Sequence, residues 1–551
     1  MPVDRRHLAL VGFVCLAAAC AHGGDDYLRD LQTRAIEADQ SPSAHWGMTP
    51  DKYTQWGSHS NRLIPVYTFG TLGAGPGIDL TSYTGENSPY RSAEKLRAIY
   101  GYDPSDSVNS QADYLDQTNI YDVQAAALKA GKKHIILVIF DGMDWVTTRA
   151  AAIYNTQSVG YTEGRGHGTH FQDYTAGGNT QFGFMVTSPH NDGTKVNINE
   201  QQVLNPGGSQ LGGYNPNRAG DTPWATPSDE RYLIGQPKEK PGTHAYTDSS
   251  SSASSMSAGV KTFNNAVNVD ASGTPVTTIA HEAQDDGYAV GVVTAVPIPH
   301  ATPACMYAVN VDRDDYQDLT RDLIGLPSIS HPSRPTAGLD VVIGCGWGVD
   351  KETDKAQGEN FVPGNRYLTA EDLAAVDVQQ GGRYVVAQRE PGVSGKQSLQ
   401  AAANQAAQAK QRLLGFYGAA SHLPFQTANG DYKPAPGRTK PEKYTPADLA
   451  ENPTLADMAA AALEVLSQRD KGFWLMVEAG DVDWANHDDN LDNSIGAVNS
   501  GAAAVKVITD WVEQHSNWNE TVLIVTADHG HYLVLDRPED LIRPQPAAAP
   551  Q

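Results

Sequence analysis

The sequence predicts an α/β fold with a mostly parallel central sheet and helices on both of its faces. Five short apolar runs, rich in β-branched residues, are separated by longer segments with helical periodicity. Strands that alternate with helices in this way pair in parallel through right-handed crossovers. Acidic and imidazole side chains follow several of the apolar runs. Because binding sites in such folds lie beyond the carboxyl ends of the strands, we expect a site at that edge of the sheet.

The first expected strand is the apolar run at 133–140, whose unbroken β-branched character suits a strand buried on both faces. Four further runs share this character, at 289–295, 339–344, 473–477 and 522–526. Helical periodicity predicts helices at 276–284, 398–414, 455–468 and 491–512.

The domain organisation that we expect is a signal peptide at 1–20, an N-terminal elaboration at 21–128 and an α/β domain at 129–551. Two long segments, near 160–245 and 346–452, interrupt the alternation of strands and helices. Segments of this length without a regular pattern are typically functional loops or mobile insertions. We therefore expect both segments to shape access to the site.

The N-terminus has the features of an export signal. Arg5 and Arg6 precede an apolar run at 8–19 that is too short to span a membrane permanently. The run ends in Ala-Ala-Ala before Cys20, which resembles a bacterial lipobox with Ala in place of Leu at its first position. Either lipidation of Cys20 or ordinary cleavage nearby fits, so we expect an exported protein, periplasmic or anchored by a lipid on Cys20.

Two of the four cysteines, Cys305 and Cys345, lie beyond the signal segment. In an oxidising compartment they could form a disulfide, and they could equally be two buried thiols. No CxxC or other close Cys/His zinc pattern occurs. Any metal ion must therefore be bound by Asp, Glu, His and hydroxyl groups.

The chain is strongly acidic, with 40 Lys and Arg against 64 Asp and Glu and a formal net charge of −24. This charge excludes duplex nucleic acid as a specific partner, because the phosphate backbone would be repelled. It would also repel anionic substrates. An enzyme that processes anions on this chain needs local cations, either metal ions or arginine.

The residues after the expected strands are candidate metal ligands. Asp483 and His487 are spaced i,i+4, so one helical turn presents both on the same face. Carboxylates, imidazoles and hydroxyls of this kind suit Zn²⁺ and Mg²⁺. Singly, an Asp at a strand end can be a helix cap and an Asp…His pair can be a solvated helix face. Their repetition along one sheet edge predicts a metal site from Asp141, His300, Thr302, Glu478, Asp483, His487, Asp528, His529 and His531.

A serine-rich stretch at 247–262 carries the candidate nucleophile. Asp248 or Ser249 can cap a helix whose first N–H groups point towards an anion. The positive potential at such a helix start favours a serine that attacks a phosphoryl group. The alternative is a flexible serine-rich linker.

Together these motifs resemble the alkaline phosphatase family, from about Lys133 to His531 and in the family's order. The matching motifs are Asp-Gly-Met, Thr-Asp-Ser…Gly-Val-Lys-Thr, Ala-Thr-Pro, Val-Glu…Asp…His and Thr-Ala-Asp-His. The resemblance implies hydrolysis of phosphate monoesters through a phosphoserine intermediate, with two Zn²⁺ and one Mg²⁺. Homodimers are common in the family, so a homodimer is also expected.

The resemblance also implies a role for each matching residue. Ser249 resembles the nucleophile, Arg313 the arginine that clamps phosphate, and Asp248 the acid that orients this arginine. The implied ligands are Asp141, Asp528 and His529 for the first zinc, Asp483 and His487 for the second, and Asp141, Thr302 and Glu478 for magnesium.

The chain departs from the family at three places. His300 stands where some members have Asp, and Trp484 where some have Lys. The family's second zinc takes a further histidine from a later segment, and none occurs in the 20 residues after His531. His531 could serve instead, an insertion histidine such as His167 or His170 could substitute, or the site could be weakened by truncation.

Three other functions compete with the phosphatase. A sulfatase is suggested by the Cys/Ser-x-Pro-x-Arg pattern at 330–334, although sulfatases place it soon after the first metal-binding Asp, so we expect a turn there. A phosphodiesterase could use a similar bimetallic core but usually has a Thr nucleophile. The third competing function is that of an exported metal- or phosphate-binding protein without catalysis. It is suggested by the absence of the second zinc's further histidine.

Overall fold

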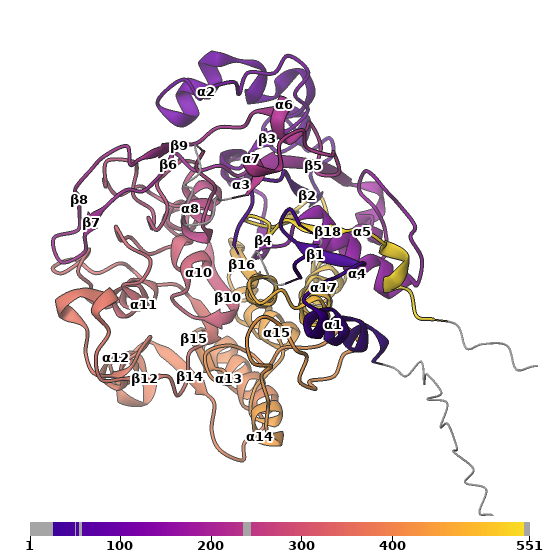
Figure 1. Ribbon diagram of the computed structural model, residues 1–551. Coiled ribbons are helices and arrows are strands. Elements are labelled where there is room, and N and C mark those ends of the chain that lie inside the picture. The colour runs from indigo at the N-terminus through magenta and orange to yellow at the C-terminus, as the bar shows by residue number, and fades with distance from the viewer. Residues whose placement is uncertain (1–25, 50, 54–57, 235–243, 545–551) are drawn as a thin grey trace, which may run out of the picture.

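The computed structural model describes residues 26–49, 51–53, 58–234 and 244–544 (Figure 1). Its main feature is a ten-stranded sheet with the order β14-β15-β11-β10-β16-β4-β17-β2-β5-β3. The seven strands from β14 to β17 pair in parallel, whereas β2 is antiparallel to both β17 and β5. The predicted fold class, a mostly parallel sheet in an α/β protein, is confirmed.

All five predicted strands are present. They are β4 (His134–Phe140), β10 (Ala289–Pro297), β11 (Val341–Cys345), β16 (Phe473–Ala479) and β17 (Thr521–Thr526). All but the first residue of β4 are buried along these strands. Burial on both faces explains their continuous apolar sequences.

Five further strands of this sheet were not predicted from the sequence. The N-terminal elaboration supplies β2 (Ile64–Phe69) and β3 (Leu115–Asp116), the segment near 160–245 supplies β5 (Thr180–Val186), and the segment near 346–452 supplies β14 (Tyr384–Gln388) and β15 (Arg412–Tyr417). The remaining short strands are β1 (Ala44–Trp46), β6 (Asn191–Asp192), β7 (Val196–Asn197), β8 (Gln202–Val203), β9 (Gln210–Leu211), β12 (Asp350–Lys351), β13 (Gly364–Asn365) and β18 (Leu533–Leu535). The division into an N-terminal elaboration and an α/β domain stays a prediction.

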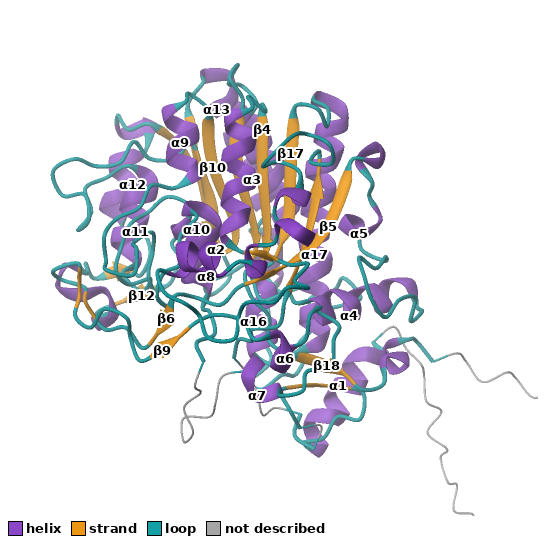
Figure 2. Ribbon diagram, turned by 90° about the horizontal axis from the view of Figure 1, so that it is seen from above, coloured by secondary structure: helices purple, strands orange, loops and turns teal. Residues whose placement is uncertain are grey.

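Helices cover both faces of the sheet. On one face α3 (Thr118–Lys129), α8 (Ser249–Ala258), α9 (Ile279–Asp285) and α10 (Ala301–Cys305) contact one another, and Figure 2 shows α3 lying over β4 and its neighbours. On the other face α4 (Trp145–Thr156), α13 (Gly395–Ala409), α15 (Leu455–Leu466), α16 (Asp481–His487) and α17 (Leu491–His515) pack together. The other helices are α1 (Tyr27–Ala38), which lies beside α17, α2 (Ala93–Tyr100), α5 (His170–Asp173), α6 (Pro216–Ala219), α7 (Glu230–Leu233), α11 (Tyr316–Ile324), α12 (Ala370–Val376) and α14 (Pro446–Ala450).

One predicted helix was too long. The helix expected at 398–414 ends as α13 at Ala409, and residues 412–414 belong to β15 instead. Lys410 adopts a left-handed conformation with φ of 53°, and its N–H bonds back to the carbonyl groups of Ala406 and Ala407. The left-handed residue and its hydrogen bonds end the helix, so the apolar residues that follow form a strand and not another helical turn.

The compartment and redox predictions are tested only in part. Residues 1–20, with Cys20, lie outside the described residues, so the signal peptide and the lipid anchor stay predictions. Among the helices that the structure describes, none combines the length and apolar character needed to cross a membrane. Cys305 and Cys345 are both buried free thiols, so the disulfide alternative is wrong for this structure.

Candidate active site

Three acidic residues meet at the carboxyl ends of adjacent parallel strands. Asp141 directly follows β4, Glu478 lies near the end of β16, and Asp528 comes two residues after β17. Since β4 pairs with both β16 and β17, the three carboxylates become neighbours although they are far apart in sequence. The sheet edge predicted to carry the site does carry these residues.

These carboxylates are buried, and their hydrogen bonds are incomplete. Asp141, Glu478 and Asp528 are each 0% exposed, and one oxygen of each has no hydrogen-bond partner among the described residues, as is also true of Thr302 Oγ1. Burial and the charge of Asp528 hold the pKa of Asp141 well above its usual range. Burial likewise raises the pKa of Glu478 to about 8 and that of Asp528 to about 6. Buried anions of this kind fit divalent cations, which would supply the missing counter-charge.

The first group of ligand atoms is close enough together to hold one metal ion. The ligand atoms of Asp141, Asp528 and His529 lie within 4.8 Å of one another. His529 Nε2 is 3.3 Å from Asp141 Oδ1 and 3.4 Å from Asp528 Oδ2. With zinc–ligand distances of about 2.0–2.1 Å, two ligands of a tetrahedral ion lie roughly 3.3–3.4 Å apart. Burial lowers the pKa of His529 to about 3, which keeps its imidazole neutral and able to bind a metal.

The second group surrounds Asp483 on α16. The ligand atoms of His59, Asp483, His529 and His531 lie within 4.8 Å of one another. His487, one helical turn after Asp483, places Nε2 3.4 Å from Asp483 Oδ1, as the i,i+4 spacing predicts. His59 was missed by the sequence analysis, because 428 positions separate it from His487 and no local pattern marks it.

Ser249 faces the first group from the start of α8. Its Oγ lies 3.1 Å from His529 Nε2 and 3.5 Å from Asp141 Oδ1. Asp248 is the N-cap of this helix and accepts a hydrogen bond of 3.0 Å from the Ser251 N–H. Every residue of α8 is buried, so the linker alternative for this stretch is wrong. The first turn of α8 therefore directs its positive end towards the metal ligands.

Arg313 lies beside this serine. Its Nη1 donates a hydrogen bond of 3.0 Å to Asp248 Oδ2, and the two side chains are only 14% and 13% exposed. Burial would raise the pKa of Asp248, but the Arg313 charge and the hydrogen bonds from Ser251 and Ser250 lower it to about 2. The guanidinium is thus held next to Ser249 by an ionised carboxylate.

Comparison with known proteins identifies the family of this chain. The model of the alkaline phosphatase family matches residues 214–547. The chain belongs to the alkaline phosphatase family. It is 29% identical over 314 residues to alkaline phosphatase 4 of Bacillus subtilis, a match that covers 56% of each chain. It is 30% identical over 317 residues to the alkaline phosphatase of Escherichia coli K12, covering 56% of this chain and 63% of that one. The chain therefore spans less than two thirds of the length of these relatives.

Among solved structures, the alkaline phosphatase of Thermus thermophilus is similar with a TM-score of 0.44 and 22% identity. The similarity covers 73% of this chain and 60% of that one. The alkaline phosphatase of the Antarctic bacterium TAB5 is similar with a TM-score of 0.41 and 18% identity, over 73% of this chain and 80% of that one.

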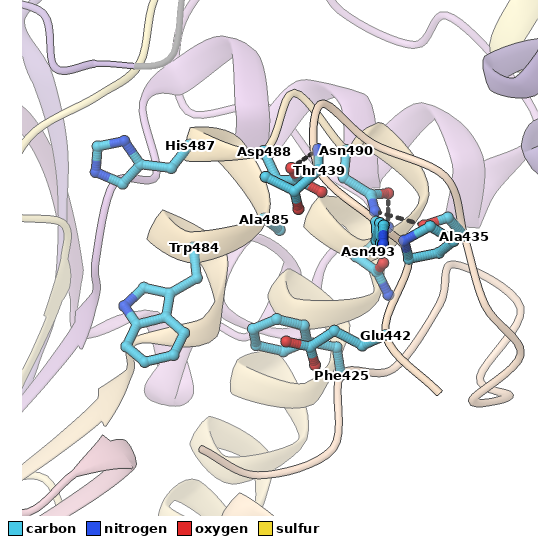
Figure 3. A pocket seen from close by; sticks show the side chains of 12 residues that line it. Phe425, Ala435, Thr439, Glu442, Trp484, Ala485, His487, Asp488, Asn490 and Asn493 are labelled. Atoms are coloured by element: carbon cyan, nitrogen blue, oxygen red, sulfur yellow. Dashed lines mark hydrogen bonds between the residues drawn. The ribbon is translucent and has the colours of Figure 1, made fainter. Parts of the chain in front are cut away.

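The two residues that depart from the family lie next to each other. The rings of His300 and Trp484 are 5.7 Å apart. Burial, and then the nearby Arg313 charge, lower the pKa of His300 to about 3. Trp484 and His487 also line a pocket of about 380 Å³, and Figure 3 shows both side chains projecting from α16 away from Ala435. The two departures are thus in contact with each other, and Trp484 directly follows the candidate ligand Asp483.

Neither insertion histidine reaches the site. His170 Nε2 lies 2.8 Å from Thr509 Oγ1, and His167 packs against Tyr161. The alternative in which one of them substitutes for the missing ligand is therefore wrong. The sulfatase-like pattern at 330–334 lies in the loop between α11 and β11, where His331 pairs with Asp322 at 2.9 Å.

Proposed function

We propose that this protein hydrolyses phosphate monoesters through a phosphoserine intermediate on Ser249, with two Zn²⁺ and one Mg²⁺. The observation that carries the proposal is the position of Ser249 Oγ, 3.1 Å from His529 Nε2 and at the start of α8. Family membership supports it, because the curated relatives are phosphatases. The proposed exported location and homodimer rest on the resemblance and on the N-terminal sequence.

The ions would be held by residues that converge at the sheet edge. Asp141, Asp528 and His529 would hold the first zinc, Asp483 and His487 the second, and Asp141, Thr302 and Glu478 the magnesium. Bound there, the ions would supply Lewis acidity that lowers the pKa of a hydroxyl group or water and offsets phosphate charge. Their positive charge would also offset the negative charge of the chain at the site.

The residues of the chain perform the substitution at phosphorus. Arg313 would grip two equatorial phosphate oxygens with its planar fork, while Asp248 keeps the guanidinium in place. Ser249 Oγ then attacks phosphorus while its proton passes to solvent, and the bond from phosphorus to the departing ester oxygen breaks. The alkoxide takes a proton and leaves as the alcohol. Water attacks the phosphoserine in turn, which releases phosphate and returns the proton to Ser249 Oγ.

The test is the Ser249→Ala variant assayed with an aryl phosphate monoester at alkaline pH, with Zn²⁺ and Mg²⁺ supplied. We expect turnover by the wild type and loss of at least about 10³-fold in kcat for the variant, because the nucleophile is removed. Ser255→Ala is the matched control: Ser255 is buried in the same helix and donates its hydroxyl proton to the Ser251 carbonyl group. It should turn over like the wild type.

Parallel assays with a phosphate diester and a sulfate ester address the competing functions. Faster turnover of either ester than of the monoester would contradict the proposal. Phosphate binding without turnover by the metal-loaded wild type would identify a binding protein instead. Retained activity of Ser249→Ala would refute the assigned nucleophile.

A further inference from the structure

We propose that His59, from the N-terminal segment, completes the second metal position together with Asp483 and His487. The inference rests on the proposed metal site and adds a ligand that neither the motifs nor the family match contains, since that match begins at residue 214. It also gives the second position three protein ligands from within the chain.

The distances between ligand atoms support this assignment. His59 Nε2 lies 3.2 Å from His487 Nε2 and 3.8 Å from Asp483 Oδ1, and His487 Nε2 lies 3.4 Å from Asp483 Oδ1. The edges of a tetrahedron around zinc are roughly 3.3–3.4 Å long. The three atoms therefore form a triangle that a single zinc ion can cap with small adjustments.

The orientation of the His59 ring points to the same role. Its Nδ1 lies 2.9 Å from the carbonyl oxygen of Thr247, which can only accept, so Nδ1 carries the hydrogen. Nε2 is then the unprotonated nitrogen, and it is the atom directed at His487 and Asp483. A backbone carbonyl that fixes the tautomer in this way is typical of metal-binding histidines.

His531 belongs to the same group of ligand atoms, but its contact with Asp483 suits a different role. Its Nε2 is 2.7 Å from Asp483 Oδ1, which is a hydrogen-bond distance and is too short for two ligands of one tetrahedral ion. His531 instead donates this hydrogen bond to Asp483. It would position the carboxylate, while His59 binds the ion.

The backbone holds His59 in place against the end of β17. The N–H of Ser60 donates a hydrogen bond of 2.7 Å to the carbonyl of Gly530, between His529 and His531. The His59 ring stacks on His529 with 3.7 Å between centroids. Downstream, β2 continues antiparallel to β17. The metal would thus join the N-terminal segment to α16, which carries Asp483 and His487.

The experiment measures zinc in the full-length protein without substrate. Wild type, His59→Ala, His531→Ala and His45→Ala are loaded with Zn²⁺, and bound metal and affinity are measured by elemental analysis and chelator competition. His45 is the matched control, because it is a buried N-terminal histidine paired with Asp536 at 2.9 Å and belongs to neither group of candidate ligands.

We expect His59→Ala to bind one zinc fewer per chain or to bind the weaker zinc at least about 100-fold less tightly. His531→Ala should lose roughly 10- to 100-fold in affinity, as for a residue that positions a ligand. His45→Ala should match the wild type. The visible d–d absorption of Co²⁺ in the second position should change for His59→Ala.

His59→Asp, which restores a metal-binding atom, keeps the inference testable if the alanine variant misfolds. Partial recovery of the second metal by this variant supports the assignment. Unchanged zinc affinity and Co²⁺ spectrum in folded His59→Ala would overturn it, as would a wild type that binds no second metal. If the wild type is inactive and the His59→Ala variant still loses the second zinc, the proposed phosphatase activity is refuted. The assignment of His59 as a metal ligand then still holds.

Discussion

Removal of the Arg313 side chain should damage substrate binding and the stability of the helix start together. Arg313 pairs with Asp248 at 3.0 Å in a largely buried position. The pKa of Asp248 is about 2 instead of its usual 3.8, since the Arg313 charge and hydrogen bonds outweigh the effect of burial. At about 1.4 kcal/mol per pKa unit, these interactions contribute about 2–3 kcal/mol to the free energy of unfolding at neutral pH.

Because the pKa of Asp248 is lowered on folding, this contribution is present above about pH 4 and is lost as the pH falls towards 2. Arg313→Ala should therefore lower the free energy of unfolding at pH 7 by about 2 kcal/mol, and the difference should shrink below pH 4. Urea unfolding at several pH values measures this change.

The kinetic effect of Arg313→Ala should be larger. Two charge-assisted hydrogen bonds to phosphate, at about 1.5–3 kcal/mol each, correspond to a loss of roughly 10²- to 10⁴-fold in kcat/KM. Inhibition by inorganic phosphate should weaken as well. Arg313→Lys should be intermediate, because lysine keeps the charge without the planar fork.

The matched control is Arg321→Ala, in which a similarly buried arginine, 3.0 Å from Asp372, is removed from α11. It should cost stability without changing kcat/KM or phosphate inhibition. The reasoning is refuted if Arg313→Ala, with wild-type zinc content, changes both kinetic measures less than threefold.

Three further predictions concern stability. Burial and then the Asp318 charge raise the pKa of Asp315 to about 8, so this group destabilises the fold increasingly as the pH rises from 4 to 8. At about 1.4 kcal/mol per pKa unit, Asp315→Asn should add up to about 5 kcal/mol to the free energy of unfolding at pH 8 and almost nothing at pH 4, as measured by urea unfolding. An equal gain at both pH values would contradict this cause. A Cβ at Gly501 would lie 2.2 Å from Phe140 Cε1 and 2.9 Å from Ala479 Cβ. Gly501→Ala should therefore lower the free energy of unfolding by about 1–3 kcal/mol and lower Tm. An unchanged Tm would show that α17 can move away from the sheet. Removal of bound metal by a chelator should lower Tm, and zinc at about 1,000 times its Kd should restore about 4 kcal/mol of the free energy of unfolding. Equal Tm values with and without zinc would mean that the native state gains no stability from the metal.

Much of the central fold could be predicted from local sequence. The strands β4, β10, β11, β16 and β17 are buried on both faces, so each has a continuous apolar sequence that can be recognised without knowledge of its partners. The polar residues that follow several of these strands can also be recognised in the sequence, because a charged or imidazole side chain ends the apolar run there. The outer strands β2, β3, β5 and β14 were missed, since they lie in segments without a clear pattern, and the start of β15 was assigned to a helix.

The sequence by itself determined which residues are available to bind metal and phosphate: Asp141, Asp483 and Asp528 stand out by their position after apolar runs. Only the tertiary structure decided their distances, because the order β16-β4-β17 places distant segments side by side. It also decided the role of His59, which approaches His487 because Ser60 pairs with Gly530 and β2 pairs with β17. Strand pairing between distant segments depends on packing throughout the molecule, so local residue patterns do not reveal it.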